Sequence, residues 1–141
     1  MIKLELDTFT MFDVYTKEVR SILELAVPVW HSGLTKNQTR DIERIQRISF
    51  QIILGSAYVN YKQACNLLGS QTLEERRVKL CLKFARQNVK SDNCMFKKPA
   101  NTVITRHSNR LVREYKCRTK RYQNSSLPYL AKLLNKNNRR K

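Results

Sequence analysis

The sequence predicts a mainly α protein, a small helical bundle built on an antiparallel helix hairpin and followed by a basic, partly irregular C-terminal segment. Apolar residues recur at helical spacing in several stretches, and residues suited to helix N-caps precede them. The chain of 141 residues has only three Gly and three Pro, too few for the many turns of a β-rich fold. We expect a helical domain over residues 1–90 and a basic segment over residues 91–141, which ends in a short helix.

The first helix of the hairpin is expected over residues 8 to 27, where Val19, Ile22 and Ala26 have helical spacing. Pro28 is predicted to stop it, because the residue before a proline is disfavoured in the α region. Gly33 is predicted to let the chain reverse. Trp30 is expected to pack into the elbow against Leu23 or Ile45.

The second helix of the hairpin is expected to begin at a capping box, with Thr35 as N-cap and Gln38 three residues later. Gly55 is expected just past its end, in the left-handed conformation that glycine adopts there. So short a connection predicts that the two helices lie side by side. The apolar stripe predicted to face the first helix consists of Ile42, Ile45, Ile48 or Ser49, Ile52 and Ile53.

Three further helices are predicted. One covers residues 58 to 68, with Asn60 as N-cap and Gly69 after its end, and another opens at a second capping box formed by Thr72 and Glu75. This longer helix runs to about residue 90, and its predicted buried stripe consists of Leu73, Leu80, Cys81, Phe84 and Ala85. The last helix is expected to start at Ser126.

The net charge of +17 is graded along the chain. Residues 1–30 hold three Lys/Arg and five Asp/Glu, residues 31–90 hold eleven and four, and residues 91–141 hold fourteen and two. So large an excess is costly through self-repulsion unless a polyanion binds it, although a solvated surface is the simpler alternative. The distribution is typical of a folded body that carries a nucleic-acid-binding arm.

Two groups of cations are the candidate phosphate contacts, and either group could instead be a solvated face. The first lies on the helix that starts near Thr72 and consists of Arg76, Arg77, Lys79, Lys83 and Arg86. The second consists of Lys116, Arg118, Lys120 and Arg121, four cations within six residues and with no acid among them. Tyr115 and Tyr122 alternate with this second group. Aromatic rings can stack on unpaired bases, but we expect these two to pack on the helical body while the cations contact phosphates.

Catalytic and metal-binding patterns are missing from the sequence. Polymerisation needs clustered carboxylates to hold two divalent metals, and the aspartates Asp7, Asp13, Asp41 and Asp92 stand singly. The cysteines Cys65, Cys81, Cys94 and Cys117 form no CxxC pair, and a shared site of Cys94, His107 and Cys117 matches no common metal spacing. We expect no cofactor and no metal. No apolar run is long enough for a transmembrane helix, and acids within the N-terminal stretch argue against a signal peptide.

Three ordered blocks, which together cover about residues 8 to 135, carry a resemblance to a known family. The run VRSILELAVPVWHSGLT, followed by DIERIQR, resembles the C-terminal region of non-LTR retrotransposon reverse transcriptases of the jockey and CR1-like branches. The run LLGSQTLEERRVKLCLKFA resembles the next block of that region, and RTKRYQNSSLPYLAKLLN resembles its closing segment. Leu25, Val27 and Ser32 depart from the Tyr, Ser and Pro expected there, which points to a diverged or decaying copy.

The resemblance implies a region beyond the catalytic palm, in or after the helical thumb of an RNA-directed DNA polymerase. We therefore expect a nucleic-acid-binding fragment without the catalytic palm, with RNA, DNA or an RNA–DNA hybrid as partner and a cytoplasmic or nuclear location. The rest of the polymerase, if present, would be a second partner, and no membrane partner is expected. The alternative is a helical docking module of a larger retroelement polyprotein. A free-standing enzyme is disfavoured because the carboxylate cluster is missing.

Overall fold

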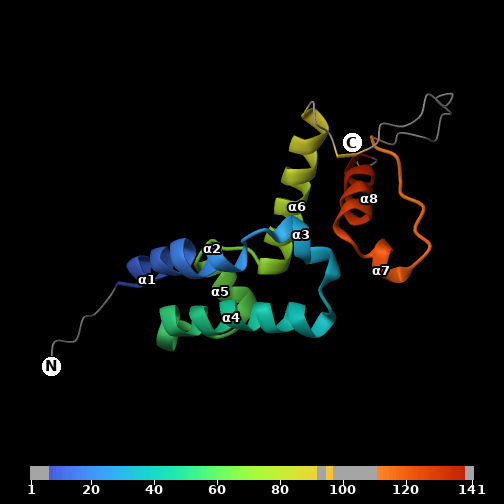
Figure 1. Ribbon diagram of the computed structural model, residues 1–141. Helices are drawn as coiled ribbons and strands as arrows, with labels where there is room; N and C mark the ends of the chain where they lie inside the picture. Colours follow the sequence, from blue (N-terminus) through green and yellow to red (C-terminus); the bar gives the residue numbers. More distant parts are fainter. Residues whose placement is uncertain (1–6, 92–94, 97–110, 139–141) are drawn as a thin grey trace. The chain divides into compact units, whose positions relative to one another are not determined.

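The computed structural model describes residues 7–91, 95–96 and 111–138 (Figure 1). The described residues are mainly helical and contain no β-strand, which confirms the predicted fold class. Two compact units are present. Unit 1 comprises residues 1–25 and 35–76, and unit 2 comprises residues 26–34 and 77–141. The division falls inside one long helix and therefore differs from the predicted boundary at residue 90.

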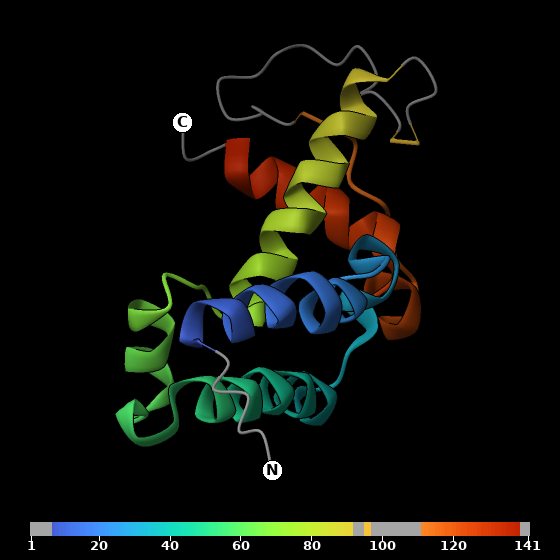
Figure 2. The same ribbon diagram turned by 90° about the vertical axis from the view of Figure 1, so that its left-hand side faces the viewer.

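Unit 1 is built on the predicted antiparallel hairpin. Its first arm is helical throughout and consists of α1 (Thr8–Val14), the π-helical turn η1 (Tyr15–Val19) and α2 (Arg20–Leu23). Its second arm is α4 (Lys36–Leu54), which lies alongside the first arm and runs in the opposite direction (Figures 1 and 2). The 3-10 turn η3 (Gly55–Ala57) and α5 (Tyr61–Leu67) follow.

The predicted start and stop residues of α4 and α5 are confirmed. Thr35 and Gln38 form the reciprocal capping box at the start of α4, and Asn60 accepts a hydrogen bond from the Gln63 N–H at the start of α5. Gly55 follows the end of α4 as predicted and has a positive φ of 50°, but its ψ of −120° lies outside the left-handed helical region that was expected. Gly69 has φ of 57° after α5, and glycine adopts such positive φ values at little cost.

The buried face of α4 differs from the predicted isoleucine stripe. Ile53 of this stripe is buried as predicted, but Ile45, Ile48 and Ile52 are exposed, and Phe50 and the polar residue Gln46 are buried instead. The helix is therefore rotated relative to the prediction, so that Phe50 packs against Phe12, Tyr15 and Tyr61.

A buried hydrogen-bond network around Gln46 explains this rotation. The Tyr15 hydroxyl donates to Gln46 Oε1 at 2.8 Å, and Gln46 Nε2 donates to the Tyr61 hydroxyl and to the Gln71 carbonyl, both at 2.9 Å. The Tyr61 hydroxyl in turn donates to Glu43 Oε1 at 2.5 Å. The buried amide oxygen and nitrogen of Gln46 are therefore both hydrogen-bonded. Through these bonds the Gln46 side chain joins α4 to η1, α5 and the turn before α6.

Burial raises the pKa of both tyrosine hydroxyls in this network well above the ordinary value, and for Tyr61 the bond to Glu43 adds to that effect. Both groups therefore stay protonated and able to donate at neutral pH.

Unit 2 contains α3 (Val27–Trp30), the 3-10 turn η2 (His31–Gly33), most of α6 (Leu73–Lys90), α7 (Lys120–Gln123) and α8 (Ser126–Asn138). Its core consists of Val27, Cys81, Ala85, Phe96, Val112, Leu130, Ala131 and Leu134. Cys81 and Ala85 come from the face of α6 that was predicted to be buried. Leu130, Ala131 and Leu134 supply the matching face of α8.

The structure corrects four predictions about the elbow. The first helical arm ends at Leu23, and the chain turns at Ala26, a non-glycine residue with φ of 52°. Pro28 lies in the first turn of α3, where a proline fits without losing a hydrogen bond, so it starts a helix instead of stopping one. Gly33 lies in η2 without a positive φ. Trp30, which was predicted to be buried in the elbow, is half-buried and packs against the core of unit 2.

Candidate nucleic-acid interface

The two structural units differ completely in charge. Unit 2 contains nineteen of the 28 Lys/Arg and two of the eleven Asp/Glu, so its net charge is +17. Unit 1 contains nine of each, and its net charge is zero. Among the described residues of unit 2, Glu114 is the one acid, and every Lys and Arg except Arg77 is exposed. The positive charge is thus a property of one unit, which makes unit 2 the candidate site for a polyanion.

Helix α6 presents four of these cations, Lys79, Lys83, Arg86 and Lys90, and we call them the α6 row. Their spacing of four, three and four residues places them on one face of the helix. All four are exposed. At a rise of about 1.5 Å per residue the row is about 16 Å long, a length that can follow several phosphates. Lys90 belongs to the row although it was not among the predicted contacts.

The local sequence explains why α6 begins where it does. The Thr72 hydroxyl accepts a hydrogen bond from the Glu75 N–H at 3.2 Å, which confirms the predicted N-cap. Glu43 Oε1, from α4, accepts a bond from the Leu73 N–H at 3.1 Å. Glu74 and Glu75 lie in the first turn, where negative charge is favourable.

Two of the predicted phosphate contacts, Arg76 and Arg77, are not among the exposed cations of α6. Arg76 is paired with Glu24. Its Nε contacts Glu24 Oε1 and its Nη2 donates to Glu24 Oε2 at 2.9 Å, and this pairing raises the pKa of Arg76. Arg77 is fully buried, on the same face of α6 as Leu73 and Cys81. The exposed cationic face of α6 therefore begins at Lys79.

A second group of cations lies on the extended segment before α7 and in α7 itself. Lys116, Arg118, Lys120 and Arg121, the predicted phosphate contacts, are all exposed, and we call them the 116–121 run. Arg113 is also exposed on this segment. Thr119 caps α7 by accepting a hydrogen bond from the Tyr122 N–H at 3.2 Å, so the last two cations of the run lie in a defined helical turn.

Asn135 fixes the start of this segment to α8. Its Oδ1 accepts hydrogen bonds from the N–H groups of Leu111 and Val112 at 2.9 and 3.2 Å, and its Nδ2 donates to the Val112 carbonyl at 3.0 Å. Asn135 and Val112 are both buried. The Asn135 side chain thus supplies the hydrogen bonds that a neighbouring β-strand would otherwise give to the backbone N–H and C=O groups of this extended segment. Asn135 was not among the residues predicted from the sequence. In the sequence, Asn135 is recognisable only as a polar residue next to the apolar stripe of the last helix.

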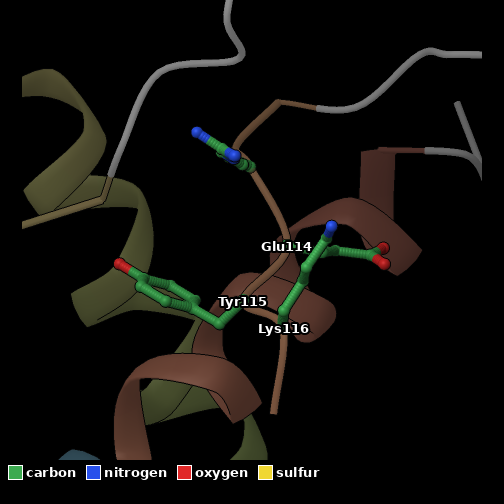
Figure 3. Close-up of a pocket in the computed structure, with 4 residues that line it drawn as sticks. Glu114, Tyr115 and Lys116 are labelled. Atoms are coloured by element: carbon green, nitrogen blue, oxygen red, sulfur yellow. The ribbon is translucent and has the colours of Figure 1, made fainter.

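The side chains along the segment alternate in direction. Figure 3 shows Tyr115 pointing to one side of the chain and Glu114 and Lys116 to the other. These residues and Arg113 line a shallow pocket. Tyr115 packs against the core of unit 2, and its hydroxyl donates to the Met95 carbonyl at 3.2 Å. Tyr115 is therefore anchored, as predicted, while Lys116 faces solvent.

The aromatic rings of unit 2 give little surface for stacking. Phe96 is buried, and Trp30, Phe84, Tyr115 and Tyr129 pack against the core. Tyr122 was predicted to pack but is exposed to 43%. Among the described aromatic residues of unit 2 it is the one large exposed ring, so this surface presents far more charge than base-stacking area.

A hollow of about 490 Å³ lies where the C-terminal ends of α6 and α8 meet. Arg86 and Lys90 of the α6 row line it together with Asn137 and Asn138 of α8. Charged and amide donors on one concave surface suit the oxygens of a sugar–phosphate backbone. Lys132 and Lys136 are exposed on α8 and add cations that the sequence analysis did not select.

Metal-ligating side chains do not cluster among the described residues. No group of three His, Cys, Asp or Glu side chains that could hold a metal is present among them. Cys94 and His107, which were considered with Cys117 as a metal site, lie outside the described residues. Burial raises the pKa of the Cys81 thiol to about 11 and also raises that of Cys65, so neither is a thiolate nucleophile at neutral pH. None of the described helices is long and apolar enough to cross a membrane.

The fold and the surface define a helical protein with one neutral and one strongly cationic unit. No protein-family model, curated protein or solved structure matches the chain.

Proposed function

We propose that this chain binds nucleic acid through the sugar–phosphate backbone and that unit 2 is the binding unit. The observation that carries the proposal is the segregation of charge, with +17 in unit 2 and zero in unit 1. A charge excess that served only solubility has no reason to gather in one unit. The binding is expected to depend little on base sequence, because exposed Lys and Arg contact phosphates and unit 2 offers few exposed rings.

The resemblance of three ordered blocks to non-LTR retrotransposon reverse transcriptases supports this proposal and gives it a context. The chain would be a nucleic-acid-binding C-terminal fragment of an RNA-directed DNA polymerase that lacks the palm. RNA, DNA or an RNA–DNA hybrid would be its ligand in the cytoplasm or nucleus, and the rest of the polymerase, if present, a second partner. The alternative function, a docking module, is favoured by one observation, the exposed isoleucines of α4.

Salt dependence tests the binding proposal. Each phosphate contact contributes about 0.9 to the slope of log affinity against log salt on duplex DNA and about 0.7 on single strands. We expect a slope of about −3 or steeper, nearly equal for ligands of unrelated base sequence, because the exposed cations of unit 2 can neutralise several phosphates. Fluorescence anisotropy with a duplex, a single strand and a hybrid from about 50 to 200 mM salt measures it. Binding that is independent of salt, or absent at low salt, would reject the proposal.

The chain by itself is expected not to polymerise nucleotides, since its sequence has no paired aspartates for the two catalytic metals. Primer extension on an RNA or DNA template, with Mg²⁺ or Mn²⁺ and all four dNTPs, checks this. Extension that depends on dNTPs and on the purified chain would show that the chain is an enzyme.

A further inference from the structure

Helix α4 carries an exposed apolar stripe that the proposed nucleic-acid interface does not use. Ile45, Ile48 and Ile52 are 42%, 44% and 67% exposed, and their spacing of three and four residues places them on one face. The stripe lies in unit 1, whose net charge is zero, and not in the cationic unit 2. Three exposed isoleucines in one row form a continuous apolar patch, unlike the single exposed apolar residues that are common on protein surfaces.

The stripe borders a groove of about 240 Å³ between the two arms of the hairpin. Ile52 contributes to both the stripe and the groove, and Val14 of α1, which is 52% exposed, lines the opposite side. The other lining residues are Met11, Tyr15, Val19, Ser49 and Ile53. Groove and stripe together offer one apolar surface along α4, the kind of surface on which the apolar face of another helix docks.

A row of cations on the N-terminal half of α4 reaches the other edge of the stripe at Arg44. Lys36, Arg40 and Arg44 follow one another at four-residue spacing on α4, and all three are exposed. Arg44 and Ile48 are four residues apart and so lie next to each other on the helix surface. Asp41 is exposed near the N-terminal end of the stripe, and the bordering row itself contains only cations.

We propose that this surface of α4 docks an acidic amphipathic helix of a partner protein. The apolar side of the partner helix would cover Ile45, Ile48, Ile52 and the groove, and its carboxylates would lie along Arg40 and Arg44. The charge of the bordering row selects an acidic partner over a basic one, because like charges at this edge would repel. This docking is independent of phosphate binding by unit 2.

The test uses the full chain and two synthetic helical peptides. Both carry leucines at i, i+3 and i+7 spacing; one has glutamates beside the leucines, and the other has lysines at the same positions. By fluorescence anisotropy the acidic peptide is expected to bind about 10-fold tighter than the basic one. The double variant Ile48→Gln, Ile52→Gln should weaken that binding about 10-fold. Ile22→Gln, at an isoleucine that is 72% exposed but does not line the groove, should leave it unchanged.

The double variant Arg40→Glu, Arg44→Glu is expected to reverse the preference, so that the basic peptide binds more tightly. Circular dichroism checks that each variant keeps its helices. Equal affinity for both peptides, or no response to the Ile48 and Ile52 changes, overturns the proposal. The proposal is also overturned if RNA displaces the peptide and the Arg40 and Arg44 variant binds RNA more weakly. That result would assign this edge of α4 to nucleic acid. A dimer of the chain that the Ile48 and Ile52 variant abolishes would assign the surface to a second copy.

Discussion

Replacing Asn135 by Ala should destabilise the protein by about 3 kcal/mol, because the change leaves buried backbone groups without partners. Asn135 satisfies the N–H of Leu111 and both the N–H and the carbonyl of Val112. Each unsatisfied buried group costs about 1–3 kcal/mol, and water can reach Leu111 more easily than the buried Val112. Against a usual total of about 5–15 kcal/mol, this loss is large.

Urea unfolding followed by circular dichroism measures the loss. Asn137→Ala is the matched control, since Asn137 lies on the same helix at the rim of the hollow and is only half-buried. This control should change the free energy of unfolding by less than about 0.5 kcal/mol. Trypsin should also cleave the Asn135→Ala variant faster after Arg113 and Lys116. A loss below about 1 kcal/mol would show that Asn135 does not hold this segment in place.

The helix boundaries of this protein follow from local sequence. Thr35, Asn60 and Thr72 act as N-caps in the structure, and Gly55 and Gly69 have the positive φ expected after a helix. These features depend on a few neighbouring residues, so pattern reasoning finds them. The division into units depends instead on contacts between distant residues. It falls between Arg76 and Arg77, inside a helix that shows no break in its sequence pattern.

The buried face of α4 shows where local reasoning fails. Five isoleucines were predicted to share the buried face, but a polar residue, Gln46, is buried because Tyr15, Tyr61 and Gln71 supply its hydrogen bonds. A hydrophobic pattern treats Gln as a surface residue, and only the folded arrangement shows that its amide is satisfied. The isoleucines left outside, Ile45, Ile48 and Ile52, then become the proposed docking surface.

The exposed cations of the candidate interface were also predicted only in part from the sequence. The 116–121 run is exposed as expected, since closely spaced cations without acids seldom find internal partners. Arg76 and Arg77 look like Lys79 and Lys83 in the sequence, but Arg76 pairs with Glu24, which is 52 residues away along the chain. Arg77 lies on the buried face of α6. Both outcomes depend on tertiary contacts, which a count of charges along one helix does not reveal.

The central claim, that unit 2 and not unit 1 binds phosphates, is tested by two variants with equal net charge. In the first, Lys116, Arg118, Lys120 and Arg121 of unit 2 are replaced by Gln. In the second, the exposed cations Lys36, Arg40, Arg44 and Lys62 of unit 1 are replaced by Gln. Each variant loses four of the seventeen net charges and has a net charge of +13. Any difference between the two therefore reports where the charge lies.

The measurement is the slope of log affinity against log salt for a duplex, compared between the wild-type chain and both variants. Each phosphate contact contributes about 0.9 to this slope, so the unit 2 variant should flatten it by up to about 3, whatever the base sequence. The unit 1 variant should change it by less than about 0.5. Circular dichroism and sedimentation establish that both variants are folded and share one oligomeric state. Equal flattening in both, or a larger effect in the unit 1 variant, would contradict the assignment of nucleic-acid binding to unit 2.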